Sequence, residues 1–265
     1  GGKDIYFSTL SNGVWSKPKN AGPNINTAGD ERYPFIHIDG TLYYITPERS
    51  IEIQQNLGAD IIFAFDECTS PTETFAYQEE ALLRTHQWAK RSLEQHEKLE
   101  EANDFAYSLP QALFGIVQGG REESLRKKSA KTIAEMKTGS GQGFDGFGIG
   151  GSFAKEDMST VVKWVNEILP ENKPRHLLGI GEPEDLFMGV ENGVDFFDCV
   201  APTRMARNGA LYTKNGKINM FNAEHKENFS KIEEDCECYT CKNYSCAYIA
   251  HLFRAKEMLA ATLAT

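Results

Sequence analysis

The chain has 265 residues, of which 40% are hydrophobic, and a formal net charge of −10. This length allows one large domain or two small ones with a buried core. No run of about 18 apolar residues is present, so we expect no membrane span. The acidic balance argues against diffuse binding to nucleic acid but is compatible with a local basic site.

The first 45 residues read as short strands and turns. Residues 4–10 and 14–16 flank the turn signal Ser11-Asn12-Gly13, and a second pair of strands flanks Asp39-Gly40, which predicts two β-hairpins. The segment resembles the repeats of TolB-like β-propellers and covers about one blade. One blade cannot bury its own faces, so we expect residues 1–45 to form no stable domain alone.

From residue 46 onward, apolar strands alternate with helical patterns. Strands are expected at 61–65, 113–117, 146–149, 176–180 and 194–197, and helices at 75–102, 122–137, 157–169 and 183–191, with Asp157 as a cap. Repeated strand–helix units with apolar strands predict a parallel sheet, either a barrel or a doubly wound sheet. Five units are too few to close a (β/α)8 barrel.

The last part of the chain changes pattern again. A hairpin is expected over 210–221 with its turn at Asn215-Gly216, followed by a cysteine cluster and a final helix. Clustered cysteines indicate a metal site and a reducing compartment. Cys236, Cys238 and Cys241 supply three thiolates for a tetrahedral Zn²⁺. The fourth ligand stays open between Cys246, His251 and His225, and His251 reads better as a helix-surface residue.

Each predicted strand ends in a chemically distinctive group. The endings are Asp66-Glu67-Cys68, Gln118-Gly119-Gly120, Gly150-Gly151-Ser152, Gly179-Ile180-Gly181 and Asp198-Cys199. The carboxyl ends of parallel strands line one site, so we expect these residues to converge. A single Asp after a strand is more often a helix cap or turn residue, but five such endings in succession favour a common site.

Two arginines, Arg204 and Arg207, follow closely on Asp198. Guanidinium groups suit phosphates and base edges. The alternative interpretation is a solvated loop with ordinary surface arginines.

These residues, from about 47 to 265, resemble the tRNA-guanine transglycosylase family. The resemblance rests on residues 47–54, 59–61, 65–68, 113–120, 149–151, 197–200, 202–204 and 207–209, and on the Cys-x-Cys-x2-Cys motif. It implies a (β/α)8 barrel of which the chain holds the last five units. The expected domains are therefore a β segment at 1–45 and a partial barrel at 46–265, with a zinc-binding subdomain at about 210–250.

The resemblance also implies a reaction in which guanine at wobble position 34 of tRNA is exchanged for a 7-deazaguanine. Asp198 matches the nucleophile, which forms a covalent ester with the ribose. Base-binding groups are implied at Asp66, Cys68, Gln118, Gly150, Gly151 and Leu178, and tRNA contacts at Arg204 and Arg207. The zinc is structural, and its fourth ligand, a His, would follow Thr265.

The chain also departs from the family pattern. A second catalytic Asp within a Ser-Gly-Gly-Phe motif is absent, and we assign Asp30 and Asp39 to turns. The chain starts without Met and stops inside a helical pattern, so we expect both ends to be cut and the chain to be impaired or inactive. The junction with the β segment is expected between Tyr33 and Thr46. Ser152 and Ala154 depart from the usual pocket wall.

The implied partners are a tRNA with a GUN anticodon, a 7-deazaguanine and a second copy of the chain in a homodimer, all in the cytoplasm. Cys68 favours the small precursor preQ1 over queuine. One alternative is a non-catalytic zinc-containing subunit that binds tRNA. Another is a propeller-type binding module outside the cytoplasm, which exposed zinc-binding thiols oppose because oxidation would destroy them.

Overall fold

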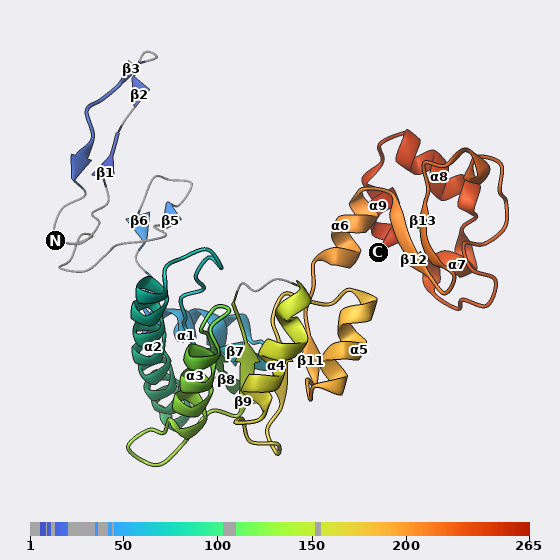
Figure 1. Cartoon of the computed structure of the whole chain (residues 1–265). Coiled ribbons are helices and arrows are strands. Elements are labelled where there is room, and N and C mark those ends of the chain that lie inside the picture. Colours follow the sequence, from blue (N-terminus) through green and yellow to red (C-terminus); the bar gives the residue numbers. More distant parts are fainter. Residues whose placement is uncertain are drawn as a thin grey trace.

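The computed structural model describes residues 6–8, 10–11, 14–20, 35–36, 42–43, 45–102, 110–151 and 155–265. Its central element is a five-stranded parallel sheet with the order β11-β10-β9-β8-β7 (Figure 1). The strands are β7 (Ile61–Phe63), β8 (Ala112–Val117), β9 (Gly146–Ile149), β10 (Arg175–Leu177) and β11 (Phe196–Phe197). Neighbours in the sheet follow one another in sequence, as in a (β/α) barrel, whereas a doubly wound sheet reverses its order. The prediction of a partial barrel is confirmed.

The sheet curls so that one face becomes an interior. Phe63 on β7 packs its ring against Phe114 on β8, with centroids 5.7 Å apart. The same ring lies 5.4 Å from the imidazole of His176 on β10. Two strands, β8 and β9, separate β7 from β10 in the sheet. A side chain can reach across them only if the sheet is strongly curved.

Strand β9 has glycine at alternate positions, and these face the interior. A Cβ on Gly146 would lie 2.4 Å from the Phe114 ring, and one on Gly148 would lie 3.1 Å from both Phe63 and Leu178. The intervening residues, Phe147 and Ile149, are buried in the main apolar core. Neighbouring strands therefore fill the interior beside β9.

Helices cover the outer face of the sheet (Figure 1). They are α1 (Pro47–Leu57), α2 (Phe75–Ala102), α3 (Glu123–Glu135), α4 (Met158–Asn166), which follows the short helix η1 (Lys155–Asp157), and α5 (Pro183–Glu191). The core between helices and strands includes Ile51, Ile62, Leu113, Leu93, Ile133 and Val162. The bounds of α2 and α5 match the predicted ranges. Asp157 occupies the cap position of α4 but makes no capping hydrogen bond, because its carboxylate pairs with Arg121 at 2.6 Å.

Helix α1 was not predicted, although its ends carry clear signals. The Thr46 hydroxyl accepts a hydrogen bond from the Arg49 N–H, and Gly58 ends the helix in the left-handed region at φ 72°. The amide of Gln54 bonds to both backbone groups of Phe63, at 2.9 and 3.0 Å. Helix α1 is therefore fixed to strand β7.

The N-terminal strands form small antiparallel pairs: β1 (Tyr6–Phe7) with β4 (Lys19–Asn20), β2 (Leu10–Ser11) with β3 (Val14–Trp15), and β5 (Phe35–Ile36) with β6 (Leu42–Tyr43). The two predicted hairpins are confirmed by the last two pairs. Residues 12–13 and 37–41 between the paired strands lie outside the described residues, and so does Asp30. No side chain of this segment whose burial is described is buried, and Trp15 is 66% exposed.

The C-terminal part forms a separate lobe (Figure 1), and its buried residues form a core of their own. It contains α6 (Ala201–Arg207), β12 (Ala210–Thr213), β13 (Gly216–Asn219), η2 (Ala223–His225), α7 (Tyr239–Asn243), α8 (Cys246–Arg254) and α9 (Met258–Ala264). Leu211, Met220, Ile249 and Phe253 are among its buried residues. Two corrections follow from the structure. The hairpin pairs Thr213 with Gly216, so the turn is at 214–215, and two helices stand in place of the single final helix.

No helix in the described ranges is both long and apolar enough to cross a membrane.

Candidate active site

The strand ends of β7 and β8 bring a carboxylate and an amide together. Gln118, which is buried, donates a hydrogen bond from Nε2 to Oδ2 of Asp66 at 2.6 Å. Burial raises the pKa of the Asp66 carboxyl above its usual value, the bond from Gln118 lowers it, and the neighbouring Glu67 charge raises it further. Asp66 and Gln118 therefore form a pair that is partly shielded from water. Cys68, two residues on, is exposed.

The end of β9 closes against this pair. A Cβ on Gly150 would lie 2.7 Å from Nε2 of Gln118, and one on Gly151 would lie 2.7 Å from its Oε1. Gly151 also has φ 103°, which side chains rarely adopt. Of the residues expected to converge, Asp66, Gln118 and Gly150 lie together, whereas no contact among the described residues joins Asp198 to them. Ser152 and Ala154, at the next positions, lie outside the described residues.

A buried arginine that the sequence does not single out bonds to the backbone of these strand ends from helix α3. Arg126 on α3 is fully buried and donates to the carbonyl oxygens of Val117, Gly120 and Gly150. Burial lowers the pKa of its guanidinium to about 10. Three carbonyls from two consecutive strand ends therefore share one cation.

Helices α2 and α3 supply further support. Glu67 pairs with Arg84 at 2.7 Å and accepts a hydrogen bond from the Tyr77 hydroxyl. The Ser129 hydroxyl accepts from the Gln118 N–H at 3.2 Å and bonds to the buried His86. Burial lowers the pKa of His86 to about 4, with a further contribution from Lys128. The imidazole is therefore neutral at pH 7.

The second candidate carboxylate follows β11. Oδ1 of Asp198 accepts a hydrogen bond from the Gly179 N–H at 2.9 Å and lies 3.0 Å from Nε2 of His176. The Asp198 side chain is 59% exposed. Leu178 contacts the interior beside Gly148. Asp66 and Asp198 thus follow β7 and β11, the two outer strands of one curled sheet. The rings of Phe63 on β7 and His176 on β10 contact each other across the interior.

The two arginines lie on α6, in its last turn, and both are exposed. Residues 201–207 form a helix and not a loop, but the exposure of both side chains agrees with the alternative of ordinary surface arginines. The helix packs against β12 and α9 of the C-terminal part. It begins three residues after Asp198, so the arginines follow that carboxylate closely in the sequence.

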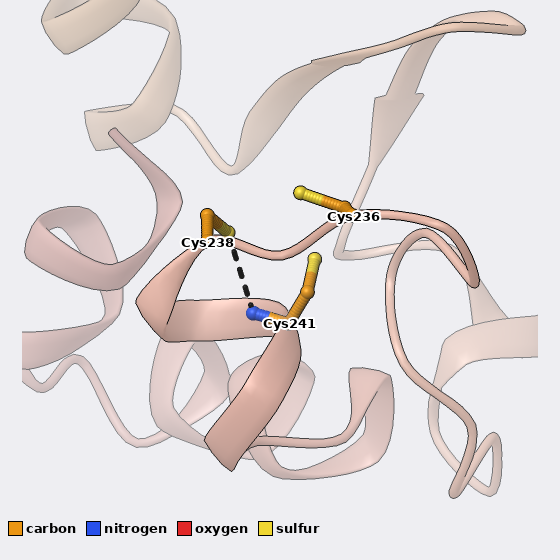
Figure 2. A group of neighbouring side chains, drawn as sticks. All are labelled: Cys236, Cys238 and Cys241. Carbon is orange, nitrogen blue, oxygen red and sulfur yellow. Dashed lines mark hydrogen bonds between the residues drawn. The ribbon is translucent and has the colours of Figure 1, made fainter.

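The three clustered cysteines meet around α7 (Figure 2). The sulfur atoms of Cys236, Cys238 and Cys241 all lie within 4.8 Å of one another. Cys238 caps α7 by accepting the Cys241 N–H at 3.4 Å, and this bond lowers the pKa of the Cys238 thiol. Such a geometry fits a single tetrahedral metal ion.

The proposed fourth ligands are not part of this group. Among the described residues, the group of potential ligands includes neither Cys246 nor His225 nor His251. Cys246 is buried, and its thiol donates to the Lys231 carbonyl at 3.4 Å.

Comparison with known proteins identifies the family of the chain. Residues 24–265 match the family model of queuine tRNA-ribosyltransferase. A queuine tRNA-ribosyltransferase of Thermoanaerobacter sp. (strain X514) is 49% identical over 232 residues, which are 86% of this chain and 58% of the relative. A putative queuine tRNA-ribosyltransferase of Archaeoglobus fulgidus is 48% identical over 237 residues, covering 85% and 55%.

The matched region has two further features. This chain spans about 58% of the length of the first of these relatives. The family match begins at residue 24, before the boundary expected at residue 46. With a family match over more than half of its residues, the chain belongs to the queuine tRNA-ribosyltransferase family.

Proposed function

We propose that the chain carries the base-exchange site of a tRNA-guanine transglycosylase, in which guanine 34 of a tRNA with a GUN anticodon is replaced by a 7-deazaguanine. The observation that carries the proposal is the placement of two unlike carboxylates at the ends of one parallel sheet. Asp66 is bonded to Gln118 and partly buried, whereas Asp198 is exposed and held on one oxygen only.

The Asp66 group suits recognition of a purine edge. A carboxylate accepts two hydrogen bonds at once, as the amino and ring N–H groups of guanine require. The amide of Gln118 and the backbone at Gly150 and Gly151 supply polar groups for the base carbonyl. Leu178 forms an apolar wall. The exposed thiol of Cys68 next to this group favours preQ1 as the incoming base.

Asp198 suits nucleophilic attack on the ribose. Its carboxylate would bond to the anomeric carbon, and the guanine would leave with the electron pair of the broken glycosidic bond and take a proton from water. The incoming base would then give up its proton, attack the same carbon and displace Asp198 with net retention. The target nucleotide must leave its stack to reach the site, and Arg204 and Arg207 would contact the tRNA beside the target base.

The decisive experiment detects a tRNA adduct that survives denaturation. Although turnover is expected to be impaired, Asp198 alone forms the ester, so the unsubstituted chain with tRNA should still give the adduct and Asp198→Asn should give none. Asp60→Asn, an exposed carboxylate at the opposite end of β7, is the matched control and should behave like the unsubstituted chain. tRNA binding without an adduct would instead favour the non-catalytic tRNA-binding subunit, which the missing Ser-Gly-Gly-Phe motif also supports.

The metal proposed for the cysteine group is a structural Zn²⁺. Cys236, Cys238 and Cys241 would hold it, because their thiols lie close enough to share one ion. The ion would stabilise the C-terminal core without taking part in base exchange. Elemental analysis should find zinc bound to the purified chain and lost in Cys238→Ser. Cys246→Ala should retain it, and zinc loss in that variant would bring Cys246 back as a ligand.

We also propose a cellular compartment, an oligomeric state and a role for the N-terminal segment. We place it in the cytoplasm, where reduced thiols persist, and we expect a homodimer, which the mass in solution would test. Residues 1–45 are proposed to be a propeller-like segment joined to the barrel. A chain that keeps residues 46–265 should therefore unfold at the same temperature as the full chain.

A further inference from the structure

The side chain of His176 makes a contact with the proposed nucleophile that the sequence analysis did not anticipate. His176 lies in the middle of β10, on the interior face. Its Nε2 is 3.0 Å from Oδ1 of Asp198, and the Gly179 N–H donates to the same oxygen at 2.9 Å. Two donors therefore meet one carboxylate oxygen.

The imidazole is held in place by aromatic rings on both sides of its strand. Phe63 meets it edge-on at 5.4 Å, and Phe196 lies 6.3 Å away. The His176 side chain is only 15% exposed, compared with 59% for Asp198. A rigid, mostly buried donor thus holds an exposed acceptor. His176, which lies in the interior, therefore restrains the mobility of the Asp198 side chain.

The second carboxylate oxygen of Asp198, Oδ2, is available to act as the nucleophile. Within the described residues, Oδ2 has no hydrogen-bond partner, whereas Oδ1 has two. A lone pair engaged with a donor is a weaker nucleophile than a free one. We infer that His176 is a positioning residue that fixes Asp198 through Oδ1, so that Oδ2 attacks the ribose; this inference rests on the proposed function.

The assignment fits both halves of the reaction. Oδ2 forms the bond to the anomeric carbon as the bond to guanine breaks, and Oδ1 becomes the carbonyl oxygen of the ester. That oxygen still accepts from His176 and Gly179. When the incoming base displaces the ester, the negative charge returns to a carboxylate that already has two donors. The imidazole needs a hydrogen on Nε2 throughout and neither gains nor loses a proton.

Two substitutions of the full-length chain test the role. His176→Phe keeps a ring between Phe63 and Phe196 but removes the donor, and His176→Gln keeps an N–H donor but cannot shuttle protons. Single-turnover adduct formation should slow by roughly 10- to 100-fold in His176→Phe, with tRNA affinity within about twofold. His176→Gln should recover most of the rate. An unchanged rate in His176→Phe, or a His176→Gln as slow as it, would overturn the inference.

A second measurement does not depend on turnover. In protein labelled with ¹⁵N-histidine, the His176 resonances should show the Nε2-protonated form, and Asp198→Asn should shift them. His176 resonances unaffected by Asp198→Asn would also contradict the inference. If the unsubstituted chain gives no adduct, the proposed function fails, while the resonances still decide whether His176 holds Asp198. Thermal unfolding of both His176 variants identifies any rate loss that comes from misfolding.

Discussion

The two ends of the curled sheet hold their carboxylates in opposite ways. At β7 and β8, Asp66 is partly buried, bonded to Gln118, and backed by Arg126 on α3. At β10 and β11, Asp198 is exposed and bonded through one oxygen. A binding group benefits from a dry, fixed surrounding, because its hydrogen bonds gain strength there. A nucleophile needs an accessible lone pair. With the roles proposed above, one sheet would meet both needs.

The largest effect is expected from removing the cation behind the binding end. Arg126→Met would leave the carbonyls of Val117, Gly120 and Gly150 buried without this donor. Each such loss costs about 1–3 kcal/mol, and Val117 keeps the Gly150 N–H as a donor, so the two remaining losses should lower the free energy of unfolding by roughly 2–6 kcal/mol. Urea unfolding measures it. Arg121→Met removes an exposed ion pair five residues earlier and should cost less than about 1 kcal/mol; equal losses would show that burial of Arg126 is not what matters.

A smaller effect, with opposite signs for binding and stability, is expected at Asp66. Asp66→Asn removes an acceptor of two hydrogen bonds and should weaken base binding roughly 10- to 100-fold, as calorimetry with the free base would show. The same change should raise the melting temperature at pH 7. Burial raises the pKa of Asp66, so its ionised form costs stability that the neutral amide does not.

The pH dependence gives the control for this prediction. A raised folded-state pKa means that the stability contribution is fully present below the unfolded value of about 3.9 and is lost as the pH rises through the folded value. The melting-temperature difference between Asp66→Asn and the unsubstituted chain should therefore vanish below about pH 4 and grow toward neutral pH. A difference independent of pH would contradict the assignment to ionisation.

The smallest effect on stability is expected for Gly148 on β9, the central strand of the sheet. A methyl group on Gly148 would sit 3.1 Å from Phe63 and from Leu178, so Gly148→Ala should lower the free energy of unfolding by about 1 kcal/mol through overpacking. Gly139→Ala is the matched control, because a Cβ there meets nothing within 4 Å. If both substitutions have the same effect on thermal unfolding, the interior beside β9 is less tightly packed than described.

Much of the fold was predictable because its signals are local. Apolar runs mark the five strands, and the groups that follow them identify the site: Asp66, Gln118 and the Gly150-Gly151 pair do converge. The helices α1 and α6 are not predicted, since residues 47–54 are interpreted only as a family motif and residues 202–209 only through their arginines.

The supporting residues could not be found in this way. Arg126 stands in a helix rich in charged residues and reads as a surface side chain until α3 packs on the sheet. His176 carries no local signal within its strand. One clue was available: the alternation of Gly and large residues at 146–150 identifies the interior face of β9, and the pairing of Gly148 with His176 then places the imidazole inside.

The glycines of β9 also limit how the packing of the interior beside them can change. Because Gly146, Gly148 and Gly150 have no side chains to shorten, every substitution at these three positions can only take space away from the interior. Room for a bulkier base must instead be made on the neighbouring strands, for example by trimming Leu178. Selection for a new substrate would therefore leave β9 untouched and act on the residues that face it.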